Sequence, residues 1–288
     1  MGIRTDLAME AHAWCLDDAG AATQLPGVRA RETTRRGITT TVVEVLNGEG
    51  AKLLDKPVGT YVTLSFDRDF LRQPRQFTAA SLQLGRAVAR MTPRSGPVLV
   101  AGLGNRALAP DALGPKALES LVVTRHLGRS LPQLRPVSAL APGVLGTTGM
   151  ESGEVLRGVV ARVRPCCVVA VDALAARCPE RICTTVQLAD SGISPGSGVG
   201  NHRLALSRET LGVPVLAVGV PTVVEAATLL QDALGSSQSP TPLCDPSMVV
   251  APRDIDARVE TMARLLGWGL SLGFHSGLGP EDVACLVG

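Results

Sequence analysis

Short apolar runs alternate with amphipathic stretches from about residue 97 to residue 234, a pattern that is typical of parallel α/β units. Several runs are almost continuously apolar, as strands are when both faces of their sheet are covered. We therefore expect the α/β class, with a mostly parallel central sheet flanked by helices. The expected strands cover residues 97–103, 135–144, 166–174, 184–190 and 213–220.

Helix signals lie between and after these runs. Pro115 suits the first turn of a helix that continues through residues 116–127. Apolar positions at helical spacing predict a helix after Glu151 and a C-terminal helix over residues 252–272. These positions are Val155, Val159 and Val163 in the first helix, and Ile255, Val259, Met262 and Leu266 in the second. The spacing of a capping box, in which side chains satisfy free backbone N–H groups, occurs in Thr148 with Glu151 and in Thr222 with Glu225.

The two ends of the chain differ from this alternating region. Residues 37–46 and 59–66 are expected to be strands, which makes the chain β-rich up to about residue 78 and places a hairpin at the sheet edge. Residues 235–247 are rich in Ser and Pro and are expected to form a loop before the last helix. A length of 288 residues is compatible with one elaborated domain.

The composition limits which binding partners and which cellular compartment we expect for this chain. The net charge of +2 and the aromatic content of 2% give no reason to expect a nucleic-acid or membrane partner. Seven cysteines without a C-x-x-C motif favour a reducing compartment. The N-terminus has no apolar signal core, and no run reaches the length of a bilayer span. We therefore expect a cytoplasmic protein.

Two aspartates stand where strands of this sheet are expected to end. Asp111 follows the turn "GLGN" (102–105), and Asp172 stands near the end of the run "CCVVAVDAL" (166–174). Sites in open α/β sheets form beyond the carboxyl ends of the strands. Two close carboxylates share a proton, so one can take a proton from water while the other protonates a leaving group. The alternative is that Asp111 caps the turn before Pro115 and that Asp172 starts a helix.

The glycine-rich segments do not identify a nucleotide site. Residues 102–105 lack the third glycine of a dinucleotide fingerprint, and residues 190–203 lack the Gly-Lys-Ser/Thr of a phosphate loop. The backbone amides around Gly196 and Gly198 could cradle a peptide carbonyl or an acidic side chain. The alternative is a long loop without a ligand. No Gly-x-Ser-x-Gly elbow is present, and four scattered histidines give no zinc pattern.

Seven blocks of sequence, in collinear order over nearly the whole chain, resemble the germination protease family of endospore-forming bacteria. The blocks are residues 3–12, 102–127, 135–154, 168–177, 193–203, 211–226 and 247–275. The resemblance implies a homotetrameric endopeptidase of the spore core that degrades small, acid-soluble spore proteins during germination. It also implies a phosphorylase/hydrolase-like fold of the hydrogenase maturation protease type. Asp111 and Asp172 would be the catalytic pair of an aspartic-type peptidase.

The resemblance further implies a zymogen that removes its own leader. Members of the family cut after an acidic residue, and "RTDLA" (4–8) matches the target segment, so the cut is expected between Asp6 and Leu7. Residues 1–6 would then be the propeptide and 7–288 the peptidase domain, although the family leader is usually longer. A cation is expected to read the acidic side chain. The candidates are Arg106, Arg177, Arg181 and Arg203.

Two other functions stay open at this point. One is a metal-dependent processing peptidase for hydrogenase subunits, which would need a third ligand, for which His202 is an outside candidate. The other is a non-catalytic α/β module that binds a small ligand or an anion. The leading hypothesis includes no metal and no cofactor.

Overall fold

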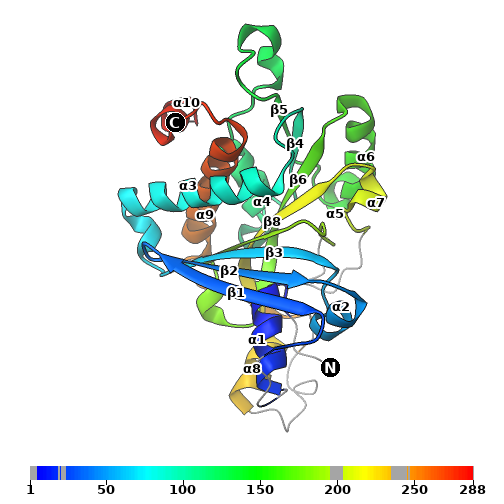
Figure 1. Cartoon of the computed structure of the whole chain (residues 1–288), viewed down its shortest axis with the longest axis vertical. Coiled ribbons are helices and arrows are strands. Elements are labelled where there is room, and N and C mark those ends of the chain that lie inside the picture. Colours follow the sequence, from blue (N-terminus) through cyan, green and yellow to red (C-terminus); the bar gives the residue numbers. More distant parts are fainter. Residues whose placement is uncertain are drawn as a thin grey trace.

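The computed structural model describes residues 5–18, 20, 24–194, 204–234, 245 and 247–287. In this part of the chain a single nine-stranded sheet has the order β1-β2-β3-β7-β8-β6-β4-β5, and β9 pairs with β8 (Figure 1). The strands are β1 (Val28–Arg35), β2 (Ile38–Val45), β3 (Gly59–Phe66), β4 (Val98–Gly102), β5 (Val137–Leu140), β6 (Cys167–Ala176), β7 (Thr185–Ala189), β8 (Val215–Glu225) and β9 (Val249–Val250).

The sheet has a parallel half and an antiparallel half. Strands β5, β4, β6 and β8 pair in parallel, and β7, β3, β2 and β1 continue the sheet with antiparallel pairs. The α/β class and the β-rich N-terminal extension are confirmed. Strand β7 runs opposite to the parallel strands because the connection from β6, residues 177–184, is too short for a parallel crossover.

Helices cover both faces of the sheet. The α-helices are α1 (Ala8–Asp18), α2 (Gly48–Leu54), α3 (Pro74–Met91), α4 (Leu113–Ala117), α5 (Leu145–Thr148), α6 (Ser152–Val163), α7 (Arg208–Leu211), α8 (Ala226–Leu234), α9 (Ile255–Phe274) and α10 (Pro280–Val287). Short 3₁₀ turns are η1 (Phe70–Arg72), η2 (Ala109–Asp111), η3 (Leu118–Ser120), η4 (Arg125–Ser130) and η5 (Pro179–Arg181).

We call the two sides of the sheet the α9 face and the α1 face. On the α9 face, α3, α4 and α9 pack on alternate residues of the strands, such as Val169, Val171 and Val218. On the α1 face, α1 and α2 pack over β3, β7 and β8, and α6 and α7 pack over β4 and β6. Because side chains alternate along a strand, each residue's number assigns it to one face.

Helices α3 and α9 cross at glycines. A Cβ atom on Gly273 would lie 2.8 Å from the carbonyl oxygen of Gly85, and one on Gly85 would lie 3.1 Å from that of Gly269. The predicted C-terminal helix is confirmed as α9, and its apolar positions, such as Val259 and Met262, are buried. This pair of helices is the main cover of the α9 face.

Three helix expectations are wrong. The helix after Pro115 ends at Ala117, because the chain beyond it is held elsewhere: Val122 N–H donates to Ser271 Oγ at 2.9 Å, and Thr124 N–H to the Val137 carbonyl at 3.0 Å. The capping box of Thr148 is not formed, because this residue ends α5.

The second expected capping box is also absent, because both of its residues belong to a strand. Thr222 and Glu225 lie within β8, which continues because β6 extends beside it as far as Ala176. Helix α8 begins only after this strand, at Ala226. Tertiary pairing has overridden the local helix signal. Most of the expected connector 235–247 lies outside the described residues.

Candidate functional site

The turn that carries Asp111 is built as its sequence suggests. Strand β4 ends at Gly102, and Gly104 has φ +105°, where a Cβ atom would lie 2.1 Å from the Asp111 carbonyl oxygen. The Asn105 side chain accepts from Ala107 N–H at 3.0 Å, and the Asn105 N–H donates to Asp111 Oδ2 at 2.7 Å. The glycines and Asn105 therefore hold Asp111 in a tight turn.

Asp172 lies inside a strand, not at the end of one. Strand β6 continues to Ala176, so neither the expected strand end nor the alternative helix start at Asp172 is correct. The reason is the long β8, which pairs with β6 past this point and places Asp172 beside Gly219. Asp172 is buried, and its Oδ1 accepts from Ala173 N–H at 2.9 Å.

Asp111 lies in the turn η2 that follows β4, and Asp172 lies in β6, the strand next to β4. Gly102 of β4 pairs with Val171 of β6, and Leu103 N–H donates to the Val171 carbonyl at 2.8 Å. The 3₁₀ turn that carries Asp111 packs against both β6 and β8. The Asp111 turn therefore lies close to β6 and β8, and it also contacts α9.

A row of polar residues crosses the α1 face at the level of Asp172. Thr63 on β3 pairs with Gln187 on β7, Gln187 pairs with Gly219 on β8, and Gly219 pairs with Asp172. We call Thr63, Gln187, Gly219 and Asp172 the polar row. Directly paired residues point to the same face, and two strand spacings put the Cα atoms of Gln187 and Asp172 roughly 10 Å apart.

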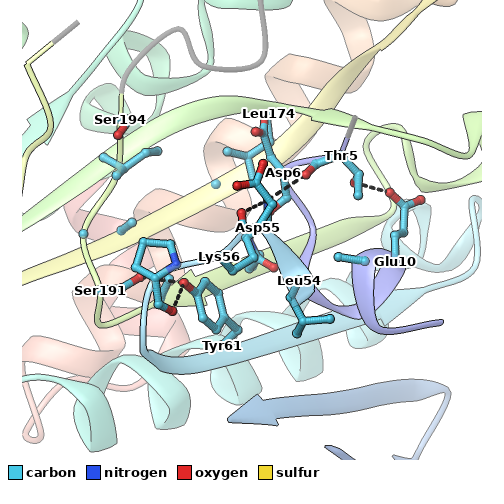
Figure 2. Close-up of a pocket in the computed structure, with 18 of the residues that line it drawn as sticks. Thr5, Asp6, Glu10, Leu54, Asp55, Lys56, Tyr61, Leu174, Ser191 and Ser194 are labelled. Atoms are coloured by element: carbon cyan, nitrogen blue, oxygen red, sulfur yellow. Dashed lines mark hydrogen bonds between the residues drawn. The ribbon is translucent and has the colours of Figure 1, made fainter. Parts of the chain in front are cut away.

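A cavity of about 1010 Å³ opens on the α1 face at one end of this row. Gln187, Gly219 and Leu174 line it, together with residues of α1, α2 and the N-terminal segment (Figure 2). Neither aspartate is among the lining residues. Leu174 explains why Asp172 does not line the cavity. Its side chain covers Gly219, because it lies 2.5 Å from the position that a Cβ atom of Gly219 would occupy.

The N-terminal segment forms part of the wall of this cavity, to which it contributes Thr5 and Asp6. Asp6 N–H donates to the Ala175 carbonyl at 2.9 Å, and Ala175 N–H donates to Asp6 Oδ2 at 2.8 Å. Gln187 Nε2 donates to the Asp6 carbonyl at 2.9 Å, and Ala8 N–H donates to Gln187 Oε1 at 2.7 Å. Leu7 is fully buried. The Asp6–Leu7 peptide is thus held on both sides.

Glu10 fixes the start of α1 to the end of β6. Its carboxylate accepts from Arg177 N–H at 2.8 Å, from Cys178 N–H at 3.0 Å and from the Thr5 hydroxyl. Lys56 Nζ donates to the Thr5 carbonyl at 2.8 Å. Figure 2 shows Asp6 beside Leu174, and Thr5 in contact with Glu10. The segment before α1 is therefore held by groups from three different elements.

Three groups near the cavity, Tyr61, Cys178 and Cys15, have raised pKa values that favour their neutral forms. Burial raises the pKa of Tyr61 to about 12, so its hydroxyl stays protonated while it donates to the Pro57 carbonyl at 2.8 Å. Burial, and then the Glu10 carboxylate, raise the pKa of Cys178, and burial raises the pKa of Cys15. A thiol is a weak nucleophile until it ionises, so neither cysteine is a plausible attacking group.

The described arginine candidates have other partners. Arg177 pairs with Asp232 of α8 at 2.8 Å and lies 4.1 Å over the Trp14 ring of α1. Arg106 pairs with Glu119, and Arg181 contacts Ser65 Oγ at 3.4 Å. The contact that the structure gives to the Asp6 carboxylate is a backbone N–H group. Arg203, His202, Gly196 and Gly198 lie outside the described residues.

Several residues around the N-terminal segment were not identified from the sequence. Gln187, Gly219, Ala175 and Glu10 all contact the segment or lie beside it. One signal was available for Gln187, since it is a polar residue inside the apolar run "TTVQLAD" (184–190), where burial of an amide needs a partner. The positions of Gly219 and Ala175 depend on strand register, and the contacts of Glu10 depend on how α1 packs against the end of β6; the sequence specifies neither.

The described part of the chain offers neither a metal-binding cluster nor a membrane-spanning helix. No group of three or more His, Cys, Asp or Glu side chains in this part of the chain could hold a metal ion. None of the described helices is long and apolar enough to cross a membrane.

Comparison with known proteins agrees with the sequence blocks. The family model of germination proteases matches residues 6–236. The germination protease of Caldanaerobacter subterraneus subsp. tengcongensis is 38% identical over 328 residues, covering 100% of this chain and 98% of that protein. That of Bacillus velezensis is 45% identical over 242 residues, covering 80% of this chain and 65% of the relative.

Among solved structures, a [NiFe] hydrogenase maturation protease, HycI from Thermococcus kodakarensis KOD1, is similar with 19% identity and a TM-score of 0.37. It covers 64% of this chain and 98% of that protein. The family model and the relatives, in contrast, cover most or all of this chain. The chain belongs to the germination protease family and is a protease.

Proposed function

We propose that this protease removes residues 1–6 of its own chain by cutting the Asp6–Leu7 bond, and then cuts small, acid-soluble spore proteins after acidic residues. Asp111 and Asp172 activate the attacking water. The observation that carries the proposal is the binding of Asp6 by Ala175 of β6 and Gln187 of β7, at the wall of the large cavity and next to the polar row that contains Asp172.

The same binding of Asp6 supports specificity for an acidic residue. The Asp6 carboxylate accepts from Ala175 N–H while the Asp6 backbone N–H donates to the Ala175 carbonyl. A substrate residue in this position adds to the end of β6 in the same way. A hydrogen bond to a charged group contributes about 1.5–3 kcal/mol, which favours Asp or Glu over their uncharged analogues. The backbone of β6 thus performs the recognition that the sequence suggested for an arginine.

In the proposed reaction the carboxylate form of one aspartate takes a proton from water as the water oxygen adds to the Asp6 carbonyl carbon. The electron pair of the C=O bond moves to oxygen. The protonated aspartate then gives its proton to the Leu7 nitrogen, the C–N bond breaks, and the oxygen pair re-forms the carbonyl. The products are a carboxylic acid at residue 6 and an amine at Leu7, and the two aspartates have exchanged roles.

One rearrangement is needed before this reaction. Leu174 lies over Gly219, which separates Asp172 from Gln187 in the polar row. A water on Asp172 reaches the Asp6–Leu7 bond only after this side chain swings aside. The described arrangement therefore corresponds to the unprocessed precursor, and Leu174 limits the rate of its activation.

The test uses the purified chain and a small, acid-soluble spore protein, incubated with and without a chelator. The cut bond is identified by mass. We expect cleavage on the carboxyl side of Glu or Asp that is unchanged by the chelator. Cleavage at unrelated residues would contradict the proposed specificity, and loss of cleavage with the chelator would favour the metal-dependent hypothesis.

A further inference from the structure

Gln187 uses both ends of its side chain on the N-terminal segment. Nε2 donates to the Asp6 carbonyl, and Oε1 accepts from Ala8 N–H. A carbonyl oxygen can only accept and a backbone N–H can only donate, so these two partners determine which end of the carboxamide carries the nitrogen. The carboxamide therefore spans the Asp6–Leu7 peptide, with one hydrogen bond on each side of it.

Burial of the Gln187 side chain destabilises the fold unless its carboxamide has hydrogen-bond partners. Gln187 is 6% exposed, on a strand whose other residues are also buried. A buried amide without a partner costs about 1–3 kcal/mol. When residues 1–6 leave, Nε2 loses the acceptor that it has in this structure. The carbonyl of an incoming peptide is the same chemical group, and it can take the same place.

The surroundings of Gln187 fit a reacting peptide. Asp172 lies two strands away on the same face, and the side chain of Leu174 covers Gly219 between them. On the other side of Gln187 stands Thr63, which is 1% exposed and whose Oγ1 has no hydrogen-bond partner within the described part of the chain. Thr63, Gln187 and Asp172 thus share one level of this face, beside the cavity.

We propose that Gln187 holds the scissile peptide, first in the leader and then in protein substrates, and that Nε2 stabilises the carbonyl oxygen as it gains charge. This inference rests on the proposed function, because it takes Asp6–Leu7 as the bond that is cut. When water adds to the carbonyl carbon, the electron pair moves onto the oxygen that already accepts from Nε2. Removal of one such donor typically slows acyl transfer by about 10²–10³-fold.

The first experiment measures self-processing of the full chain. The rate of loss of residues 1–6 is followed by intact mass for the wild type and for Gln187→Met, which keeps the length of the side chain but has no donor. We expect a rate about 10²-fold lower in Gln187→Met. The control is Thr185→Val on the same strand and face, a buried residue whose change should leave the rate within about twofold. A Gln187→Met rate within about threefold of the wild type would overturn the proposal.

The second variant separates a role at the carbonyl from a role in folding. In Gln187→Glu the protonated carboxyl group can still donate to the Asp6 carbonyl and accept from Ala8 N–H, whereas the ionised group repels the developing charge. The ratio of its rate to the wild-type rate should therefore rise as the pH falls. The charged and titratable groups nearby are Asp6, Glu10, Lys56, Tyr61, Asp172 and Arg177, and they are common to both proteins. A ratio that is constant with pH would contradict the proposal.

The two proposals fail in different ways. If the wild-type chain is not cut at Asp6–Leu7, the proposed function fails and the role of Gln187 fails with it. If Asp172→Asn is cut as fast as the wild type while Gln187→Met is slow, the aspartate mechanism fails and Gln187 keeps its role. If Asp172→Asn is inactive and both Gln187 variants behave like the wild type at every pH, only the inference about Gln187 is overturned.

Discussion

The parallel and antiparallel halves of the sheet contribute different parts of the site. In the parallel half, Asp111 and Asp172 come from the neighbouring strands β4 and β6, close to a turn whose geometry follows from its own residues. In the antiparallel half, β7 supplies Gln187, which binds a segment about 180 residues earlier in the chain. The groups proposed for the chemistry thus lie in the parallel half, whereas the peptide is held from both halves, by Ala175 of β6 and by Gln187 of β7.

The largest expected effect is on the parallel half. Asp172→Asn and Asp111→Asn should each reduce cleavage of a spore protein by about 10³-fold, because general acid–base catalysis contributes about 10²–10⁴-fold. Initial rates measured by gel or mass would show this. Asp256→Asn, an exposed aspartate in the first turn of α9, is the matched control and should keep its activity. Full activity in either of the first two variants would remove that aspartate from the mechanism.

The next effect is on the peptide-holding groups. Asp6→Ala removes the carboxylate that accepts from Ala175 N–H, a bond of about 1.5–3 kcal/mol, so self-processing should slow by about 10–100-fold. Once the leader has been removed, cleavage of added substrate should be unaffected. Asp17→Ala, in an exposed position of α1, is the control. Equal self-processing rates in Asp6→Ala and the wild type would show that the acidic side chain is not recognised here.

A smaller effect is expected where the two halves meet. Leu174→Ala removes the side chain that covers Gly219, and it should speed self-processing several-fold if Leu174 limits access of Asp172 to the bond. The change also costs stability, about 2–5 kcal/mol for a buried leucine. Leu156→Ala in α6 removes a buried leucine far from the leader and tests whether a looser fold is sufficient. The same acceleration in both variants would contradict the specific role.

The smallest predicted effect lies outside both halves. His275 is buried at the end of α9, and burial, with the nearby Arg135 charge, lowers its pKa below 6.5. The unfolded chain therefore binds a proton at this residue before the folded chain does, so stability falls as the pH drops below about 6.5. His275→Gln should flatten the dependence of the urea unfolding free energy on pH in this range. An unchanged slope would show that other groups cause the acid sensitivity.

The sequence predicted what depends on short stretches of chain. The five apolar runs are strands, and the turn at Gly104 and Asn105 has the expected hydrogen bonds, because these features are fixed by neighbouring residues. The helix signals at Thr222 and at Asp172 failed for one common reason. Both residues lie in β6 or β8, two long strands that pair along their whole length, and this pairing outweighs local preference.

The peptide-holding part of the site could not be predicted, because it depends on register. That Gln187, Gly219 and Asp172 stand in one row follows from the pairing of β7 with β8 and of β8 with β6. A shift of one residue in either pair would turn Gln187 or Asp172 to the opposite face. The Ala175 N–H of β6, which donates to the Asp6 carboxylate, also depends on this register, whereas the expected role of an arginine stays a prediction because Arg203 lies outside the described residues.

The most direct test of the whole account is the intact mass of the purified full-length chain over time, measured in parallel for the wild type and for Asp172→Asn. We predict that the wild type loses residues 1–6 and then begins at Leu7, while Asp172→Asn keeps its full mass and remains folded. Cleavage of the wild type at another bond, or equally fast loss of residues 1–6 from Asp172→Asn, would contradict the account.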